Sequence, residues 1–226
     1  MILRRPRVQI AGISTLADAL ACEAAGVDAI GFTIGLPTGP HNGLDEAGAA
    51  AIIRALPPSI TPVLITYRVT AAEVVPMCRE MGVSQVQLHA PAEPAEIQRM
   101  RAALPGLKVI LAVNVTGPEA IGLASERARY ADALILDTFD PATGRRGATG
   151  LVHDWSISAR IVETVDVPVI LAGGLTPQNV AAAIRRVRPW GVDVHTGVER
   201  PDGTTDPDLV RAFTAIAHAT PVPVRG

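Results

Sequence analysis

Lysine, cysteine and aromatic residues are scarce in this sequence of 226 residues. Phe, Trp and Tyr together make up 3% of the chain, so a buried core has to be built from Ala, Val, Leu and Ile. The two cysteines, Cys22 and Cys78, lie far apart inside helix-like patterns, and we expect reduced thiols rather than a disulfide. Lys108 is the only lysine, which restricts Schiff-base chemistry to a single position.

Strong net charge and long apolar runs are also absent. The chain has 20 basic and 22 acidic residues and a formal net charge of −2, which argues against a nucleic-acid surface. No apolar run approaches the roughly 18 residues of a membrane span, and the N-terminus lacks the apolar segment of a secretory signal. We therefore expect a cytoplasmic protein with neither a membrane nor a nucleic-acid partner. Its length suits one domain over residues 1–226.

Short apolar or β-branched runs alternate with helical patterns along the whole chain. Because a doubly wound sheet usually has five or six such units, eight of them predict an α/β fold, a single (β/α)8 barrel. The expected strands are residues 8–13, 29–34, 62–67, 85–89, 109–115, 133–138, 168–172 and 191–196.

Helix starts can be read between these runs. Thr15, Thr70 and Thr116 are each followed three residues later by Asp or Glu, a capping-box spacing. Thr176 and Asp206 each precede a proline, which favours the first helical position. A further proline, Pro76, stands inside a helical pattern and is expected to kink or shorten that helix.

The active site of such a barrel lies at the carboxyl ends of its strands. Lys108 precedes its strand and is therefore expected at the opposite face, which disfavours a lysine-dependent aldolase. Polar or glycine residues at the predicted strand ends include Arg68, His89, Asp137, Gly173, Gly174, His195, Thr196 and Gly197.

The loops after the seventh and eighth predicted strands favour phosphate binding. Gly173 and Gly174 follow the seventh strand and precede a helix start, and Thr196 and Gly197 follow the eighth. Many barrels bind phosphate at these two loops, through backbone N–H groups and a helix N-terminus. The alternative is that the glycines only allow tight turns.

Asp137 ends an otherwise apolar strand, where burial would raise its pKa and suit it to general acid catalysis. The alternative is a carboxylate that only orders its own loop. The long segment 139–153 contains Gly147 and Gly150, and it is long enough to close over a ligand. Its Arg145 and Arg146 could meet a carboxylate or phosphate, or could lie in solvent at a loop tip.

A metal site is not indicated. His41, His89, His195 and Asp137 are ligand types but have no motif spacing, so we expect neither a metal nor a cofactor. Trp155 and Trp190 are interpreted as packing residues.

Several stretches together resemble the phosphoribosylanthranilate isomerase family, almost from end to end. They are residues 9–14 (QIAGIS), 25–32 (AGVDAIGF), 85–89 (QVQLH), 136–138 (LDT), 147–150 (GATG), 154–155 (DW), 173–180 (GGLTPQNV) and 192–199 (VDVHTGVE). The resemblance implies a cofactor-independent isomerase of tryptophan biosynthesis. Its reaction is an Amadori rearrangement, in which an acid opens a phosphorylated aminoaldose ring and a base removes the C2 proton.

The same resemblance assigns roles to residues here. It makes Asp137 the acid, and it places phosphate at Gly173, Gly174, Thr196 and Gly197, with a mobile loop around residues 147–150. It implies a small phosphorylated or anionic substrate and a monomer or homodimer.

Three features depart from the family. Ala11 stands where the family has its base cysteine and Gln9 where it has lysine, and residues 37–43 lack the arginine that meets the anthranilate carboxylate. His89 and His195 are the candidate replacement bases, and Arg68, Arg145 and Arg146 the candidate anion partners.

These losses lead us to expect diverged chemistry with at most trace phosphoribosylanthranilate isomerase activity. Another isomerisation, cyclisation or elimination on the same barrel stays open, as does a non-catalytic barrel that binds a phosphate ligand.

Overall fold

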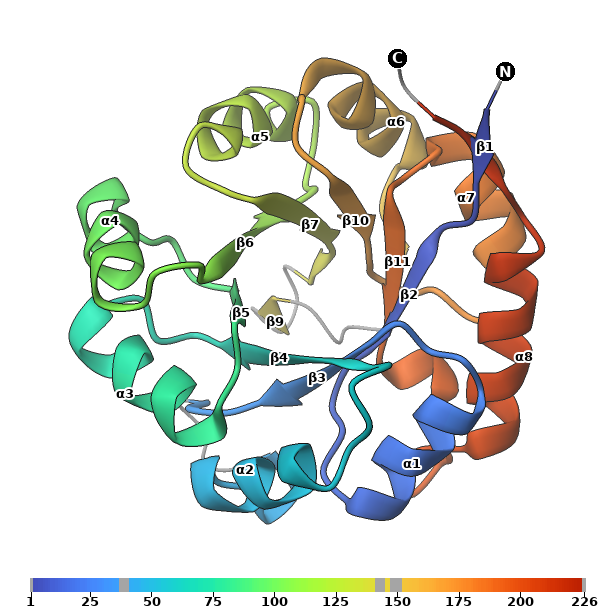
Figure 1. The fold of residues 1–226 in the computed structure, drawn as a ribbon. Coiled ribbons are helices and arrows are strands. Elements are labelled where there is room, and N and C mark those ends of the chain that lie inside the picture. The colour runs from blue at the N-terminus through green and yellow to red at the C-terminus, as the bar shows by residue number, and fades with distance from the viewer. Residues whose placement is uncertain (1, 37–40, 141–144, 147–151, 225–226) are drawn as a thin grey trace.

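The computed structural model describes residues 2–36, 41–140, 145–146 and 152–224, and shows a closed barrel of eight parallel strands (Figure 1). Around the barrel they follow the order β10, β11, β2, β3, β4, β5, β6, β7. Their bounds are β2 Arg7–Ile10, β3 Ala29–Thr33, β4 Thr61–Thr66, β5 Gln85–Leu88, β6 Lys108–Asn114, β7 Ala133–Asp137, β10 Val169–Leu171 and β11 Gly191–Val194. The (β/α)8 prediction is confirmed.

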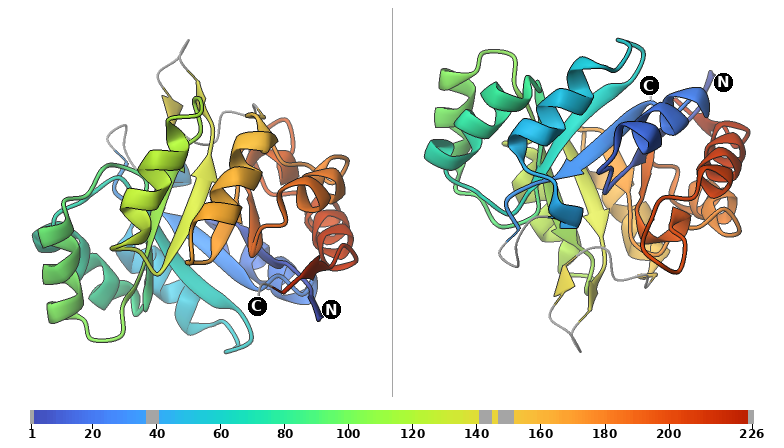
Figure 2. Two further views of the ribbon diagram at one scale, coloured as in Figure 1. Left: turned by 90° about the horizontal axis from the view of Figure 1, so that it is seen from above. Right: turned by 90° about the horizontal axis from the view of Figure 1, so that it is seen from below.

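Helices surround the barrel on all sides (Figures 1 and 2). They are α1 Leu16–Ala24, α2 Glu46–Arg54, α3 Ala71–Met81, α4 Pro94–Ala103, α5 Ala120–Ala128, α6 Trp155–Thr164, α7 Val180–Val187 and α8 Pro207–His218. The shorter elements are η1 His41–Gly43, η2 Thr196–Val198, the antiparallel pair β1 Leu3–Arg4 and β12 Val222–Pro223, and the antiparallel pair β8 Phe139–Asp140 and β9 Arg145–Arg146. Within the described residues, no helix is both long and apolar enough to cross a membrane.

Two of the predicted helix starts are confirmed by their caps. The Thr15 hydroxyl accepts the Asp18 N–H at the start of α1, and Asp206 accepts two backbone N–H groups at the start of α8. The predicted start at Thr176 is wrong, because Pro177 opens a turn and α7 begins at Val180.

The helix starts predicted at Thr70 and Thr116 differ in outcome. Helix α3 does begin directly after Thr70, although the Thr70 hydroxyl donates to Glu73 and makes no capping bond. Thr116 also bonds a glutamate, Glu119, but α5 starts only at Ala120. Helix α3 continues five residues beyond Pro76 and is not ended there.

Aliphatic side chains fill the interior, as the composition predicts. The larger core lies between strands and helices, and Trp155 packs against it. A smaller hydrophobic core lies inside the barrel, and Trp190 packs against it. Because Cys22 and Cys78 are both unpaired and buried, the pKa of their thiols is raised to about 12 and about 11.

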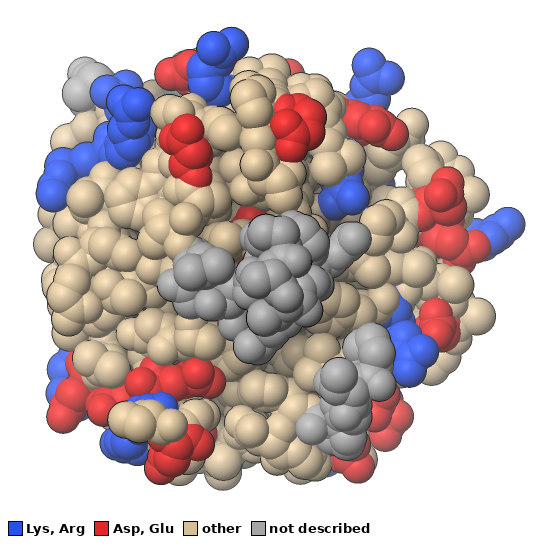
Figure 3. Space-filling view, turned by 180° about the vertical axis from the view of Figure 1, so that it is seen from behind, with Lys and Arg blue, Asp and Glu red and all other residues tan. Residues whose placement is uncertain are grey.

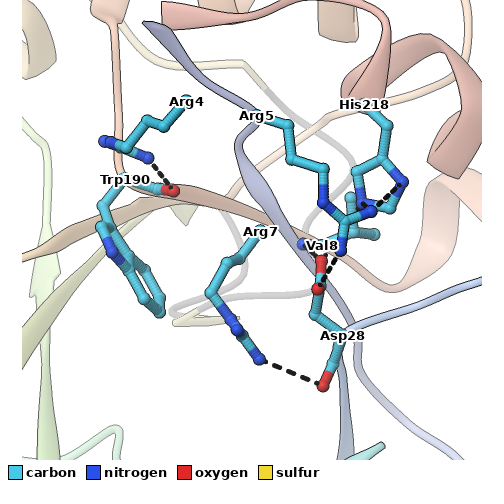
Figure 4. A network of polar contacts seen from close by, with 7 residues as sticks. All are labelled: Arg4, Arg5, Arg7, Val8, Asp28, Trp190 and His218. Carbon is cyan, nitrogen blue, oxygen red and sulfur yellow. Dashed lines mark hydrogen bonds and ion pairs between the residues drawn. The ribbon is translucent and has the colours of Figure 1, made fainter. Parts of the chain in front are cut away.

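The amino ends of the strands carry a polar network (Figure 4). Asp28 accepts the Val8 N–H at 2.9 Å and the Arg5 guanidinium at 2.7 Å, while Arg7 lies over the Trp190 ring. Lys108 is at this end too, 3.1 Å from Asp132, as predicted. These contacts stabilise the amino-terminal end of the barrel. The only lysine is therefore far from the carboxyl ends of the strands.

A cavity of about 380 Å³ lies at the same end, between Arg7, Lys108, Trp190 and small residues such as Ala29 and Ala133. It contains none of the predicted catalytic side chains, because those lie at the other end of the barrel.

Candidate active site

Asp137 is the last residue of β7, and the residue is only 5% exposed. Its Oδ1 accepts the Thr138 N–H at 2.7 Å. Burial raises the pKa of Asp137 to about 6, against the opposing effects of this N–H and of the His195 charge. A carboxyl group whose pKa is raised toward neutral pH in this way suits proton donation.

His89 follows β5 and is buried beside Asp137. Its Nδ1 lies 4.0 Å from Asp137 Oδ2 and has no hydrogen-bond partner among the described residues. Its Nε2 is 2.7 Å from the Gln87 side-chain nitrogen. Burial lowers the pKa of His89 to about 4, so its imidazole is neutral.

A line of buried polar side chains continues from Gln87 across the barrel. Gln9 Nε2 donates to Gln87 Oε1 at 3.0 Å and to Asp193 Oδ1 at 2.9 Å. Burial, together with the charge of Asp137, raises the pKa of Asp193 to about 7. We did not predict Gln87 or Asp193 as site residues, although a polar residue at an inward strand position was an available signal.

His195 follows β11, and its ring lies against Gly12, next to Ala11. A Cβ on Gly12 would be only 2.1 Å from His195 Nε2, so the backbone here leaves room for the imidazole. Glu199 Oε1 is 3.0 Å from the same nitrogen, without hydrogen-bond alignment. The His41 ring meets His195 edge to face at 5.2 Å. An imidazole beside a carboxylate thus lies against Gly12, the residue that follows Ala11.

Sequence reasoning did not predict Glu199 as a site residue, and it considered His41 only as a metal ligand. His41 and His195 are neighbours, whereas His89 bonds Gln87. Among the described residues, no three His, Cys, Asp or Glu side chains are grouped to hold a metal ion.

The glycine loops after β10 and β11 meet beside the acid. A cavity of about 30 Å³ is lined by Asp137, Asp193, His195, Thr196 and residues 172–175. Gly173 and Gly174 have φ of +82° and +62°, which only glycine adopts readily. At Gly197 a Cβ would be 1.9 Å from the Leu175 carbonyl oxygen. Both loops therefore require glycine.

Backbone donors remain available at these loops. Within the described part of the chain, the N–H groups of Gly174 and Gly197 donate to no other residue. Free N–H groups from two loops are the arrangement that binds an oxyanion.

The other predicted anion partners are less defined. Arg68 is half-exposed and pairs with Glu73 at 3.2 Å. Gly147, Gly150 and the side chains of Arg145 and Arg146 lie outside the described residues. Figure 3 views the molecule from the side opposite to Figure 1, and the described charged side chains are spread mainly around the edge of this view.

A closed parallel barrel with a buried carboxyl group of raised pKa, imidazoles and glycine loops at the carboxyl ends of its strands has the architecture of a (β/α)8 barrel enzyme. The model of the N-(5'-phosphoribosyl)anthranilate isomerase family matches residues 11–215. The chain belongs to this family of isomerases, which confirms the resemblance seen in the sequence.

Named relatives cover nearly the whole chain. N-(5'-phosphoribosyl)anthranilate isomerase 2 of Methanosarcina mazei is 42% identical over 200 residues, 88% of either chain. The isomerase of Methanocella arvoryzae is 39% identical over 95% of this chain and 99% of its own.

Solved structures agree. The Thermotoga maritima phosphoribosyl anthranilate isomerase has 30% identity and a TM-score of 0.81 over 95% of this chain and 99% of its own. A phosphoribosyl anthranilate isomerase in complex with reduced 1-(o-carboxyphenylamino)-1-deoxyribulose 5-phosphate has 29% identity and a TM-score of 0.78, with the same coverage.

Proposed function

We propose that this chain catalyses the isomerisation of N-(5'-phosphoribosyl)anthranilate, the reaction that its relatives are named for. The observation that carries the proposal is Asp137, a buried carboxyl group with a raised pKa at the end of β7. The expectation of only trace activity is replaced here for two reasons. Relatives over nearly the full length carry the isomerase name, and the His195 ring lies against Gly12, the residue after Ala11.

The first step is ring opening. The carboxyl group of Asp137 gives its proton to the ribose ring oxygen while the bond from that oxygen to C1 breaks. The nitrogen lone pair forms the C1–N double bond of an iminium ion. The Asp137 carboxylate that remains is stabilised by the Thr138 N–H, which already lies 2.7 Å away.

The second step is removal of the C2 proton, for which we assign His195. The resulting electron pair forms a C1–C2 double bond and neutralises the iminium, and the enolamine then tautomerises to the aminoketose. The Glu199 carboxylate, 3.0 Å from Nε2, favours the imidazolium that forms. His89 suits the role less well, because Gln87 already occupies its Nε2.

The phosphate is assigned to the glycine loops. Gly174 and Gly197 provide free N–H groups beside Thr196, within reach of one small cavity. Arg68, Arg145 and Arg146 are the proposed partners for the anthranilate carboxylate. A role in tryptophan biosynthesis, a cytoplasmic location and a monomeric or homodimeric state belong to the same proposal.

Growth of a tryptophan-requiring strain that lacks this isomerase tests the proposal. We expect the wild-type chain to restore growth without tryptophan and Asp137→Asn to fail, since asparagine cannot donate a carboxyl proton. No growth with soluble wild-type protein would instead favour a different reaction on this barrel, the alternative that Ala11 suggests.

A further inference from the structure

The line of buried side chains inside the barrel has a defined hydrogen-bond direction. Asp193, Gln9, Gln87, His89 and Asp137 are each at most 9% exposed, so water does not compete for their contacts. Gln9 on β2 and Gln87 on β5 are three strands apart in the barrel order and meet across its interior.

The direction begins at Asp193. The Gln9 amide nitrogen donates to Asp193 Oδ1, and this oxygen accepts the bond whether the carboxyl group is ionised or protonated on its other oxygen. The same nitrogen gives its second proton to Gln87 Oε1. The Gln87 oxygen is then occupied, and its NH2 group is the end that faces His89.

This direction determines where the proton of His89 lies. Because Gln87 donates to Nε2, that nitrogen carries a lone pair, and a neutral ring holds its proton on Nδ1. The lowered pKa of His89 agrees with a neutral ring. The Nδ1–H then faces Asp137 Oδ2 at 4.0 Å and has no other partner among the described residues.

We propose that Gln9 and Gln87 are positioning residues that hold His89 in the Nδ1–H tautomer, so that it presents a donor to Asp137. Resting on the proposed function, this assigns a purpose to a donor that is otherwise buried and unpaired. When Asp137 gives up its proton, the His89 N–H and the Thr138 N–H face its two oxygens. Gln9 contributes without touching His89 or the substrate.

The other groups near these buried side chains do not determine which nitrogen of His89 carries the proton. The Tyr67 ring lies 5.5 Å from the His89 ring, at a tilt of 39°. The charge of His195 acts on Asp137 and Asp193 rather than on the tautomer of His89.

Nitrogen-15 NMR of the imidazole nitrogens tests the proposal without reference to activity, because protonated and unprotonated ring nitrogens have well-separated shifts. The His89 signals are identified by their loss in His89→Asn. In the wild type we expect a protonated Nδ1 and an unprotonated Nε2. A wild-type His89 with its proton on Nε2 overturns the proposal, whatever the enzyme's activity.

Variants of the two glutamines test transmission along the line. Gln87→Met removes the donor to Nε2, and we expect His89 to shift mainly to the Nε2–H form. Gln9→Met frees the Gln87 amide to turn, and we expect a mixture of both forms. Gln9→Lys keeps donors toward Asp193 and Gln87 and is expected to keep the wild-type tautomer. The exposed Gln98→Met on α4 is the matched control.

An unchanged tautomer in folded Gln9→Met contradicts transmission, as does the same change in Gln9→Lys. If Gln9→Met does not fold, Gln9→Leu is the second donor-free variant, and the wild-type and Gln87→Met spectra still decide.

The pH profile of kcat/KM supplies a second readout. Loss of the donor toward Asp137 should move the alkaline limb upward by roughly half a pH unit in Gln9→Met and not in Gln98→Met. An inactive wild type with the expected tautomers would reject the proposed reaction and leave the positioning intact.

Discussion

Asp193 places a carboxyl group with a raised pKa in the barrel interior, which makes stability depend on pH. Its pKa is about 7 when folded and near 3.8 when unfolded, so between these values the folded state binds more protons. The free energy of unfolding therefore falls as pH rises through this window. Asp193→Asn should remove much of this loss, gaining at least about 1 kcal/mol on the wild type between pH 4 and pH 8.

Urea unfolding at the two pH values measures this difference, and the exposed Asp166→Asn is the control. An identical pH dependence in wild type and Asp193→Asn would contradict the assigned burial cost.

The assignment of His195 as the base predicts a rescue. His195→Asn should lower kcat by about 10² or more, because a general base contributes about that much. A cysteine at Ala11 would then place a thiol on the residue before Gly12, which the imidazole contacts in the wild type. We expect the double variant Ala11→Cys/His195→Asn to recover at least tenfold (roughly 1.4 kcal/mol) over His195→Asn in steady-state turnover.

A His195→Asn variant with wild-type kcat would remove His195 from the mechanism. A large gain in Ala11→Cys alone would show that the wild type lacks an effective base.

At the scale of elements, helix α8 depends on one cap. Asp206 accepts the N–H groups of Asp208 and Leu209 at 2.9 and 3.3 Å, and the helix packs on the barrel through Val210 and Phe213. Asp206→Ala should destabilise the protein by about 1 kcal/mol. Thermal unfolding measures this loss. Asp208→Ala is the control, because Asp208 is exposed and its side chain makes no capping bond. Equal losses in the two variants would contradict the capping role of Asp206.

Gly197, in the loop after β11, holds two loops in position at the proposed phosphate site. Gly197→Ala would push a methyl group into the Leu175 carbonyl oxygen and displace the two loops that meet there. We expect KM to rise at least tenfold, because the free N–H groups no longer converge on the phosphate. Steady-state kinetics measure it, and unchanged KM would place the phosphate elsewhere.

The strands and the loops of the site were largely predictable from the sequence, because each depends on local pattern. Residues 133–136 form a continuous apolar run that is followed directly by Asp137, so the barrel rule alone places that carboxyl group. The contacts of Gln9 with Gln87 and Asp193 join residues 78 and 184 positions apart. Their meeting depends on how the strands are staggered around the closed barrel, which no local pattern contains.

At the scale of the whole molecule, stability and chemistry occupy opposite ends of the barrel. Lys108, Asp132 and the network around Asp28 lie at the amino ends of the strands. Asp137, His89, His195 and the glycine loops lie at the carboxyl ends. This separation allows residues at the carboxyl ends to differ while the barrel itself is retained.

Steady-state turnover of N-(5'-phosphoribosyl)anthranilate, by wild type and Asp137→Asn side by side across pH, decides whether Asp137 is the acid of this reaction. We expect turnover at ordinary enzyme rates for the wild type, with kcat/KM falling above about pH 6 as Asp137 loses its proton. Asp137→Asn should lose a factor of about 10² or more with its fold intact. Absent wild-type turnover, or more than about a tenth of the activity in Asp137→Asn, would contradict it.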